Sequence, residues 1–216
     1  MNDSPDQALL ILLSGPSGSG KTTLCRRLAQ EFPGVAYSVS CTTRPARPDE
    51  VPGTSYHFLP EEEFRKRVEA GAFLECAEVH GHWYGTLRQT VYDALRDGRD
   101  VLMDIDVQGA SQLRDNVRAA PEDDLLREAL VDVFVAPPSM EALHGRICDR
   151  GTDPAGEIDR RMKAAKEEMT HWHDYAYLVV NDSLDESYGV LRAILTAEHH
   201  RVRAGKRADA LINHAV

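Results

Sequence analysis

The sequence predicts an α/β fold built on a parallel sheet. Apolar runs of strand length alternate along the chain with segments of helical periodicity, an order typical of parallel α/β sheets. The first run, ALLILL at 8–13, is apolar throughout, as a strand buried on both faces is. The glycine-rich segment SGPSGSGKTT at 14–23 follows it directly. This segment marks the turn from the first strand into the first helix.

Strands are predicted wherever a short apolar run is bounded by turn residues. The second such run, VAYSVSC at 35–41, is followed by a segment rich in proline at 42–55 that has no periodicity and is expected to be a loop. The remaining strands are expected at 56–58, 72–80, 83–85, 100–107, 131–136 and 177–181.

Helices are predicted where apolar residues recur at intervals of three and four. Leu24, Leu28 and Phe32 have this spacing, and Ser183 with Glu186 forms a capping box for the last helix. The acidic stretch at 118–130 has no functional interpretation. The other helices are expected from Pro60, over 87–95, from Ser139 to Arg150, and from Asp153-Pro154 with an apolar stripe of Ile158, Met162, Ala165 and Met169.

Composition and charge narrow the class of protein. The chain has 216 residues, which fits one domain, and a formal net charge of −10, which argues against a broad surface for nucleic acid or anionic membranes. Its four cysteines are widely spaced and form no C-x-x-C pair, so neither a zinc site nor a disulfide framework is expected. The polar, acidic N-terminus is unlike a signal peptide, and no apolar run approaches the ~18 residues of a membrane span. We therefore expect a cytoplasmic protein.

The glycine-rich segment has the pattern G-x-x-x-x-G-K-[ST] of a phosphate-binding loop. Its glycines let backbone N–H groups converge on phosphate oxygens, and the helix that follows adds its positive N-terminal end. Lys21 supplies a charge for the β- and γ-phosphates, and the Thr22 hydroxyl is a ligand for Mg²⁺. The alternative, a turn that only closes a strand–helix corner, does not require G-K-T. The residues predicted to bind ATP here are Gly15, Pro16, Ser17, Gly18, Ser19, Gly20, Lys21, Thr22 and Thr23.

A second anion site is predicted in the loop after the second strand. Arg44 and Arg47 lie three residues apart, with Ser40 before them and Tyr56 after them. Two guanidinium groups and a phenol are suited to grip a phosphate dianion. The alternative is a solvated basic loop.

Glu75 lies in an apolar, strand-like segment, where a carboxylate is costly without a partner. Guanine is a suitable partner, because its N1–H and its exocyclic amine both donate to a carboxylate. Its O6 could accept from the hydroxyl of Ser40 or Thr86. Adenine would instead set its N1 lone pair against the carboxylate. The alternative is that Glu75 forms an ordinary salt bridge.

Taken in order, these segments resemble the guanylate kinase family. The resemblance rests on the phosphate loop, SVSCTTRPARPDEVPGTSYHF, GAFLECAEVHGHWYGT, VLMDIDVQGA, RICDRGTD and YLVVND, and it covers nearly the whole chain. It implies Mg²⁺-dependent transfer of the γ-phosphate of ATP to GMP, giving ADP and GDP. It also implies a P-loop kinase core (8–39, 96–137 and 174–205), an inserted small α+β region that binds GMP (40–95) and a helical lid (138–173).

The resemblance also implies roles for particular residues. Asp104 and Asp106 would belong to the GMP-binding residues near the reacting phosphates, where they would orient Mg²⁺-bound water or substrate. Which of the two does which is left open, and two solvated carboxylates are the alternative. Asn181 is either a contact on the adenine side or a turn residue. The residues that would hold guanine are Ser40, Glu75 and Thr86, those that would hold the GMP phosphate are Arg44, Arg47, Tyr56 and Tyr84, and the arginines that would act with Lys21 in catalysis are Arg44, Arg146, Arg150 and Arg161.

Two departures and two rival functions accompany this interpretation. Cys76 and Trp83 stand where the family often has tryptophan and tyrosine, which leaves the shape of the guanine pocket open.

A non-catalytic phosphopeptide-binding module of the same fold would need the arginine loop but no phosphate loop, and the intact loop argues against it. Glu75 and Ser40 argue against a small-molecule kinase with another acceptor, because their hydrogen-bonding groups suit guanine. A monomer or a homodimer fits the sequence.

Overall fold

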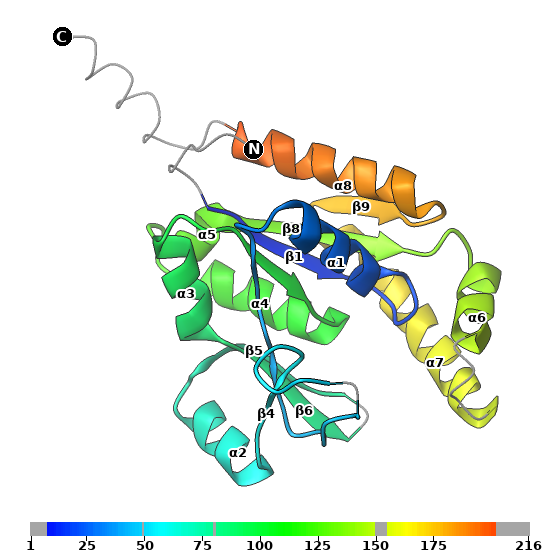
Figure 1. Cartoon of the computed structure of the whole chain (residues 1–216), viewed down its shortest axis with the longest axis horizontal. Helices are drawn as coiled ribbons and strands as arrows, with labels where there is room; N and C mark the ends of the chain where they lie inside the picture. Colours follow the sequence, from blue (N-terminus) through cyan, green and yellow to red (C-terminus); the bar gives the residue numbers. More distant parts are fainter. Residues whose placement is uncertain (1–7, 49, 80, 150–154, 202–216) are drawn as a thin grey trace.

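The computed structural model describes residues 8–48, 50–79, 81–149 and 155–201. A five-stranded sheet lies at its centre and a four-stranded sheet lies beside it (Figure 1). All strand pairs of the larger sheet are parallel, which confirms the predicted class. Its strands are β1 (Leu10–Ser14), β2 (Ala36–Tyr37), β7 (Val101–Asp104), β8 (Leu130–Ala136) and β9 (Tyr177–Val180), in the order β2-β7-β1-β8-β9.

Helices cover both faces of the larger sheet. Leu10 and Leu12 of β1 face one core cluster, whereas Ile11 and Leu13 face the other, and all four are fully buried. The apolar run of β1 therefore reflects burial on both faces, as its sequence predicts. The first cluster includes residues of α3 (Arg88–Arg96), α4 (Val107–Ala119) and α5 (Leu125–Ala129), and the second includes residues of α1 (Lys21–Glu31) and α8 (Leu184–His199).

The smaller sheet has its own core. Phe64, on the helix that covers it, stacks on Phe73 with ring centroids 4.6 Å apart. β3 pairs antiparallel with β6 and parallel with β4, and β5 pairs antiparallel with β6. This part of the chain lies within residues 40–95, for which an α+β insertion is predicted. Its elements are β3 (Cys41–Thr42), β4 (His57–Phe58), α2 (Glu61–Glu69), β5 (Phe73–Val79) and β6 (His82–Leu87).

Two helices form a pair at one end of the larger sheet (Figure 1). They are α6 (Met140–Asp149) and α7 (Ala155–Glu168), and a 3₁₀ helix, η1 (Met169–Asp174), follows α7. The Ser139 hydroxyl accepts from the Ala142 N–H at 3.1 Å, so the predicted cap of α6 is confirmed. Arg150 and the predicted helix start at Asp153-Pro154 lie outside the described residues. Among the helices described, none has the length and apolar character needed to cross a membrane.

Three sequence predictions differ from the structure. The segment 35–41 is not one strand, because β2 belongs to the larger sheet and β3 to the smaller. The patterns did not predict α4, and Asp106 caps that helix instead of ending a strand: its carboxylate accepts from the Gly109 N–H at 2.8 Å. The spacing of Leu184, Tyr188, Leu191 and Leu195 predicts one apolar stripe on the last helix, but Leu184 is 38% exposed whereas Tyr188 and Leu191 are buried.

Candidate active site

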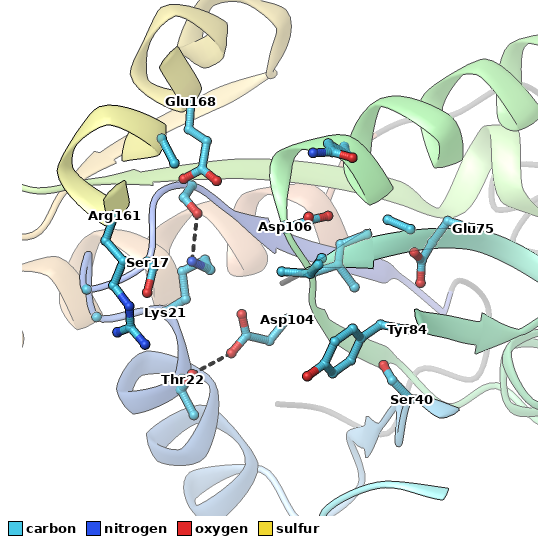
Figure 2. A pocket seen from close by; sticks show the side chains of 18 of the residues that line it. Ser17, Lys21, Thr22, Ser40, Glu75, Tyr84, Asp104, Asp106, Arg161 and Glu168 are labelled. Atoms are coloured by element: carbon cyan, nitrogen blue, oxygen red, sulfur yellow. Dashed lines mark hydrogen bonds between the residues drawn. The ribbon is translucent and has the colours of Figure 1, made fainter. Parts of the chain in front are cut away.

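One cavity of about 890 Å³ joins the phosphate loop to the smaller sheet. Figure 2 shows Lys21 and Arg161 on one side of it, Glu75 and Ser40 on the other, and Asp104 between them. The predicted site residues that line the cavity are Gly15, Ser17, Gly18, Gly20, Lys21, Thr22, Thr23, Ser40, Arg47, Tyr56, Glu75, Tyr84, Asp104, Asp106 and Arg161. Those outside its lining, among the described residues, are Pro16, Ser19, Arg44, Thr86, Arg146 and Asn181.

The phosphate loop needs glycine at two positions where it meets the sheet. Gly15 has φ 135° and Gly20 has φ 99°, values that residues with a side chain rarely adopt. A Cβ at Gly15 would collide with the carbonyl oxygen of Val135, and one at Gly20 with the side-chain amide of Asn181. Gly20 also forms the N-cap of α1. The loop thus packs directly on the sheet and presents the N-terminus of a helix to the cavity.

The Lys21 side chain folds back over this loop. Its Nζ donates to the carbonyl oxygens of Gly15 at 2.7 Å and Pro16 at 3.1 Å. An ammonium group is thereby held at the mouth of the loop, where the outer phosphates of a nucleoside triphosphate bind in proteins with this motif.

Thr22 and Asp104 bring two oxygen ligands together. The Thr22 hydroxyl donates to Asp104 Oδ2 at 2.7 Å. Asp104 ends β7, which pairs with β1 in parallel, so both side chains follow the same edge of the sheet. A hydroxyl beside a carboxylate is the ligand set with which phosphate-loop proteins hold Mg²⁺, and these residues fit that ion.

Glu75 forms the buried end of the cavity. It is 5% exposed and lies opposite Thr86 in the ladder of β5 and β6. Burial raises the pKa of its carboxyl to about 7, and the charge of Asp106 adds to that effect, while hydrogen bonds from Thr86 lower it. A ligand that donates N–H groups to this carboxyl will favour its ionised form.

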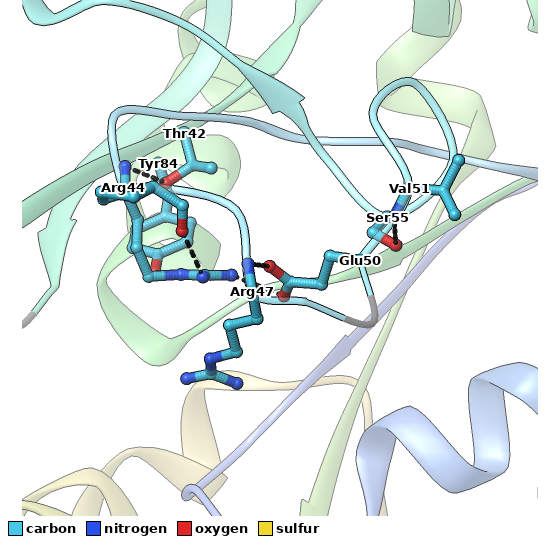
Figure 3. A network of polar contacts seen from close by, with 8 residues as sticks. Thr42, Arg44, Arg47, Glu50, Val51, Ser55 and Tyr84 are labelled. Atoms are coloured by element: carbon cyan, nitrogen blue, oxygen red, sulfur yellow. Dashed lines mark hydrogen bonds and ion pairs between the residues drawn. The ribbon is translucent and has the colours of Figure 1, made fainter.

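The two arginines of the loop take different positions. Arg47 lines the cavity, whereas the Arg44 guanidinium donates to Glu50 at 2.6 Å and to the Tyr84 hydroxyl at 3.2 Å (Figure 3). The side chains of Arg44 and Glu50 are each 13% exposed. The hydrogen bond from Arg44 lowers the pKa of Glu50, and Glu50 also accepts from the backbone N–H of Arg47 at 2.8 Å. The Arg44–Glu50 pair therefore shapes the loop from which Arg47 projects.

The arginines of the predicted lid also differ in position. Arg161 of α7 lines the cavity, with its Nε 3.4 Å from Glu157. Arg146 of α6 donates to the backbone carbonyl of Asn181 at 2.8 Å. Arg150 lies outside the described residues.

Asn181 anchors the phosphate loop. It is 5% exposed, and its side-chain amide donates to the carbonyl of Ser19 at 2.7 Å. Its backbone N–H donates to Ala136 O at 2.7 Å. The sequence patterns do not predict this anchoring, and contact with adenine stays a prediction.

Two further residues at the site have no motif to identify them. Glu168, at the end of α7, lines the cavity; burial raises the pKa of its carboxyl, while Lys21 and the backbone N–H of Ser17 act in the opposite direction. Gly109 of α4 packs against Glu75. No sequence signal pointed to either residue, because α4 was not predicted and Glu168 is one of many glutamates.

The similarity to known proteins extends over most of the chain. The family model described as guanylate kinase matches residues 7–198. The guanylate kinase of Symbiobacterium thermophilum is 47% identical over 206 residues, 95% of this chain and 92% of that protein, and that of Maricaulis maris is 47% identical over 192 residues, 89% and 84% of the two chains. The crystal structure of guanylate kinase from Anaplasma phagocytophilum shares 32% identity with a TM-score of 0.72, covering 91% of this chain and 89% of that one.

Proposed function

This chain belongs to the guanylate kinase family, and on that premise we propose that it transfers the γ-phosphate of ATP to GMP, giving ADP and GDP. One observation carries the proposal: a single cavity has a phosphate loop at one end and the buried carboxyl of Glu75 at the other. A donor of phosphate and a base with N–H donors can both enter it.

The donor end would bind ATP through the phosphate loop. Lys21 would leave the carbonyls of Gly15 and Pro16 for the outer phosphates, which carry more negative charge. Thr22 and Asp104 are the residues that would hold Mg²⁺, and their oxygens support that assignment. The ion would neutralise charge on the β- and γ-phosphates.

The acceptor end would bind GMP. Glu75 would accept from guanine N1–H and from the exocyclic amine, and Ser40, which lines the same cavity, would donate to O6. Arg47, Tyr56 and Tyr84 would hold the phosphate, and their position on the cavity wall supports this. Arg44 would contribute through Tyr84 and through the loop that it shares with Glu50.

Catalysis would need no covalent intermediate. Phosphoryl transfer depends on aligning donor and acceptor and on stabilising the charge of the transferred group. Arg161, on the lid side of the cavity, would supply positive charge there. We assign residues 138–173 to a lid that excludes water, residues 40–95 to the GMP-binding region and the remainder of 8–205 to the core. Arg146 and Arg150 remain proposed lid contributors.

A phosphopeptide-binding module is the second candidate. It would use the arginine loop alone, whereas this chain retains Lys21 and the Thr22–Asp104 pair. The named relatives are guanylate kinases, which favours the enzyme.

Base selectivity tests the proposal. A coupled assay of ADP release with ATP and each of GMP, IMP, AMP, CMP and UMP should give kcat/KM in the order GMP, IMP, AMP, with the pyrimidine nucleotides lower still. IMP lacks the amine and so loses one charge-assisted hydrogen bond, about 1.5–3 kcal/mol. Glu75→Gln should narrow the gap between GMP and AMP, because an amide can also donate to adenine N1. An unchanged GMP-to-AMP ratio in this variant would mean that Glu75 does not read the base.

We place the enzyme in the cytoplasm, as a monomer or homodimer that binds neither nucleic acid nor membranes. The net charge of −10 supports the absence of polyanion binding. Sedimentation at several protein concentrations would distinguish monomer from dimer.

A further inference from the structure

Gly109 lies in the first turn of α4, where the backbone conformation does not require glycine. Its φ lies outside the left-handed region, and glycine is among the least favourable residues inside a helix. Other helices in the described part of the chain also contain glycine, at Gly145, Gly156 and Gly189, but a Cβ at those positions would meet nothing within 4 Å. A Cβ at Gly109 would lie 2.7 Å from Glu75 Oε2. The missing side chain is therefore space that the Glu75 carboxyl uses.

The backbone of Glu75 is fixed beside α4, so its carboxyl is the part that would move. Glu75 is 5% exposed, and its backbone is held in the ladder with Thr86. The same Cβ would also lie 3.2 Å from Asp106 Oδ1, which is fixed by its hydrogen bond to the Gly109 N–H. A side chain at position 109 would have to push the Glu75 carboxyl away from α4. The cavity that both carboxylates line is where the carboxyl has room to move.

We propose that Gly109 is a positioning residue for Glu75, and that its lack of a side chain sets how far the Glu75 carboxyl reaches toward the acceptor base. This inference rests on the proposed function, because it needs guanine at that end of the cavity. Hydrogen bonds weaken steeply when distance and angle depart from their optimum. A displaced carboxyl would therefore lose most where it makes two hydrogen bonds at once, as it would with the N1–H and amine of guanine.

The test compares Gly109→Ala with Gly189→Ala, which adds the same methyl group to a helix where nothing lies within 4 Å. Rates with GMP and IMP are measured for both variants and the unmodified enzyme. Gly109→Ala should lower kcat/KM for GMP about tenfold and lower it less for IMP, because only GMP loses the bond from its amine. The KM for ATP should stay unchanged, since the donor end does not contact position 109. Gly189→Ala should leave all these values unchanged.

A double variant keeps the inference falsifiable if Gly109→Ala folds poorly. Glu75→Asp shortens the side chain by one methylene and relieves the contact, so adding it to Gly109→Ala should cost less than the two single changes predict together. Additive effects, a double variant that folds no better than Gly109→Ala, or a GMP-to-IMP ratio equal to that of Gly189→Ala would overturn the role of Gly109. Absence of phosphate transfer to GMP by the unmodified enzyme would instead overturn the proposed function.

Discussion

Thr22 and Asp104, 82 residues apart in the sequence, are joined by a hydrogen bond of 2.7 Å from the threonine hydroxyl to the aspartate carboxylate. The parallel pairing of β1 and β7 brings them together, because both follow the same edge of the sheet. If these oxygens hold Mg²⁺, Thr22→Val should raise the Mg²⁺ concentration needed for half-maximal rate by about tenfold or more, whereas Thr22→Ser should behave like the unmodified enzyme. Equal Mg²⁺ dependence in the two variants would contradict the assignment.

Lys21 should act on the donor alone. Its ammonium lies on the carbonyls of Gly15 and Pro16, within the phosphate loop. Lys21→Ala should lower kcat by about 100-fold or more, the usual loss for one group that stabilises transition-state charge, while the Kd for GMP measured by calorimetry changes little. Lys66→Ala is the control, because Lys66 is exposed and pairs with the exposed Glu62 on α2. A near-native rate in Lys21→Ala would rule out the loop as the ATP site.

Substitutions of Arg47 and Arg44 should have different effects: the first on GMP binding alone, and the second on the stability of the fold as well. Arg47→Ala removes an exposed side chain on the cavity wall, so we expect a KM for GMP at least about tenfold higher with an unchanged melting temperature. Arg44→Ala leaves Glu50, 13% exposed, without its guanidinium partner and should also lower the free energy of unfolding by about 1–3 kcal/mol. Arg65→Ala, in an exposed pair with Glu61, should change neither. Equal melting temperatures for the two loop variants would show that the Arg44–Glu50 pair does not stabilise the fold.

The buried carboxyl of Glu75 should make stability depend on pH. Folding raises its pKa from 4.5 to about 7, so the folded protein holds a proton that the unfolded chain releases between these values. The resulting stability is fully present below pH 4.5 and is lost as the pH rises through about 7. This loss amounts to about 3 kcal/mol, and Glu75→Gln should abolish it. Denaturant titrations at pH 4.5 and 8 measure the change, with the exposed Glu69→Gln as control. Parallel pH profiles for the unmodified protein and Glu75→Gln would exclude a raised pKa.

Local patterns predicted the parts of the fold whose environment is uniform. The run before Ser14 is apolar at every position because both faces of β1 are covered, and the phosphate loop has a fixed spacing because its backbone must meet the sheet at Gly15 and Gly20. Glu75 stood out because a carboxylate in an apolar strand needs a partner, and it does line the cavity. Its pairing with guanine stays a prediction.

The failures occur where tertiary contacts override local preference. Residues 35–41 have strand composition throughout, but Ala36 pairs with Val101 in one sheet and Cys41 with Gly85 in the other, and no local pattern reveals which partners are available. Helix α4 escaped notice because Gly109 weakens its helical signal. The reason for a glycine at this position is its contact with Glu75, which lies 34 positions earlier in the chain.

The hydrogen bond from Asn181 to Ser19 has a consequence for the energetics of ATP binding. It ties the middle of the phosphate loop to the end of β9, and the close approach of Gly20 to the same amide leaves the loop no room to collapse. The loop is therefore preorganised: the conformational entropy of its backbone is given up once, when the chain folds, and not again at each turnover. The affinity for ATP then depends on the stability of the sheet that holds the loop in place. A substitution that destabilises β9 would therefore weaken ATP binding without changing any residue that contacts ATP.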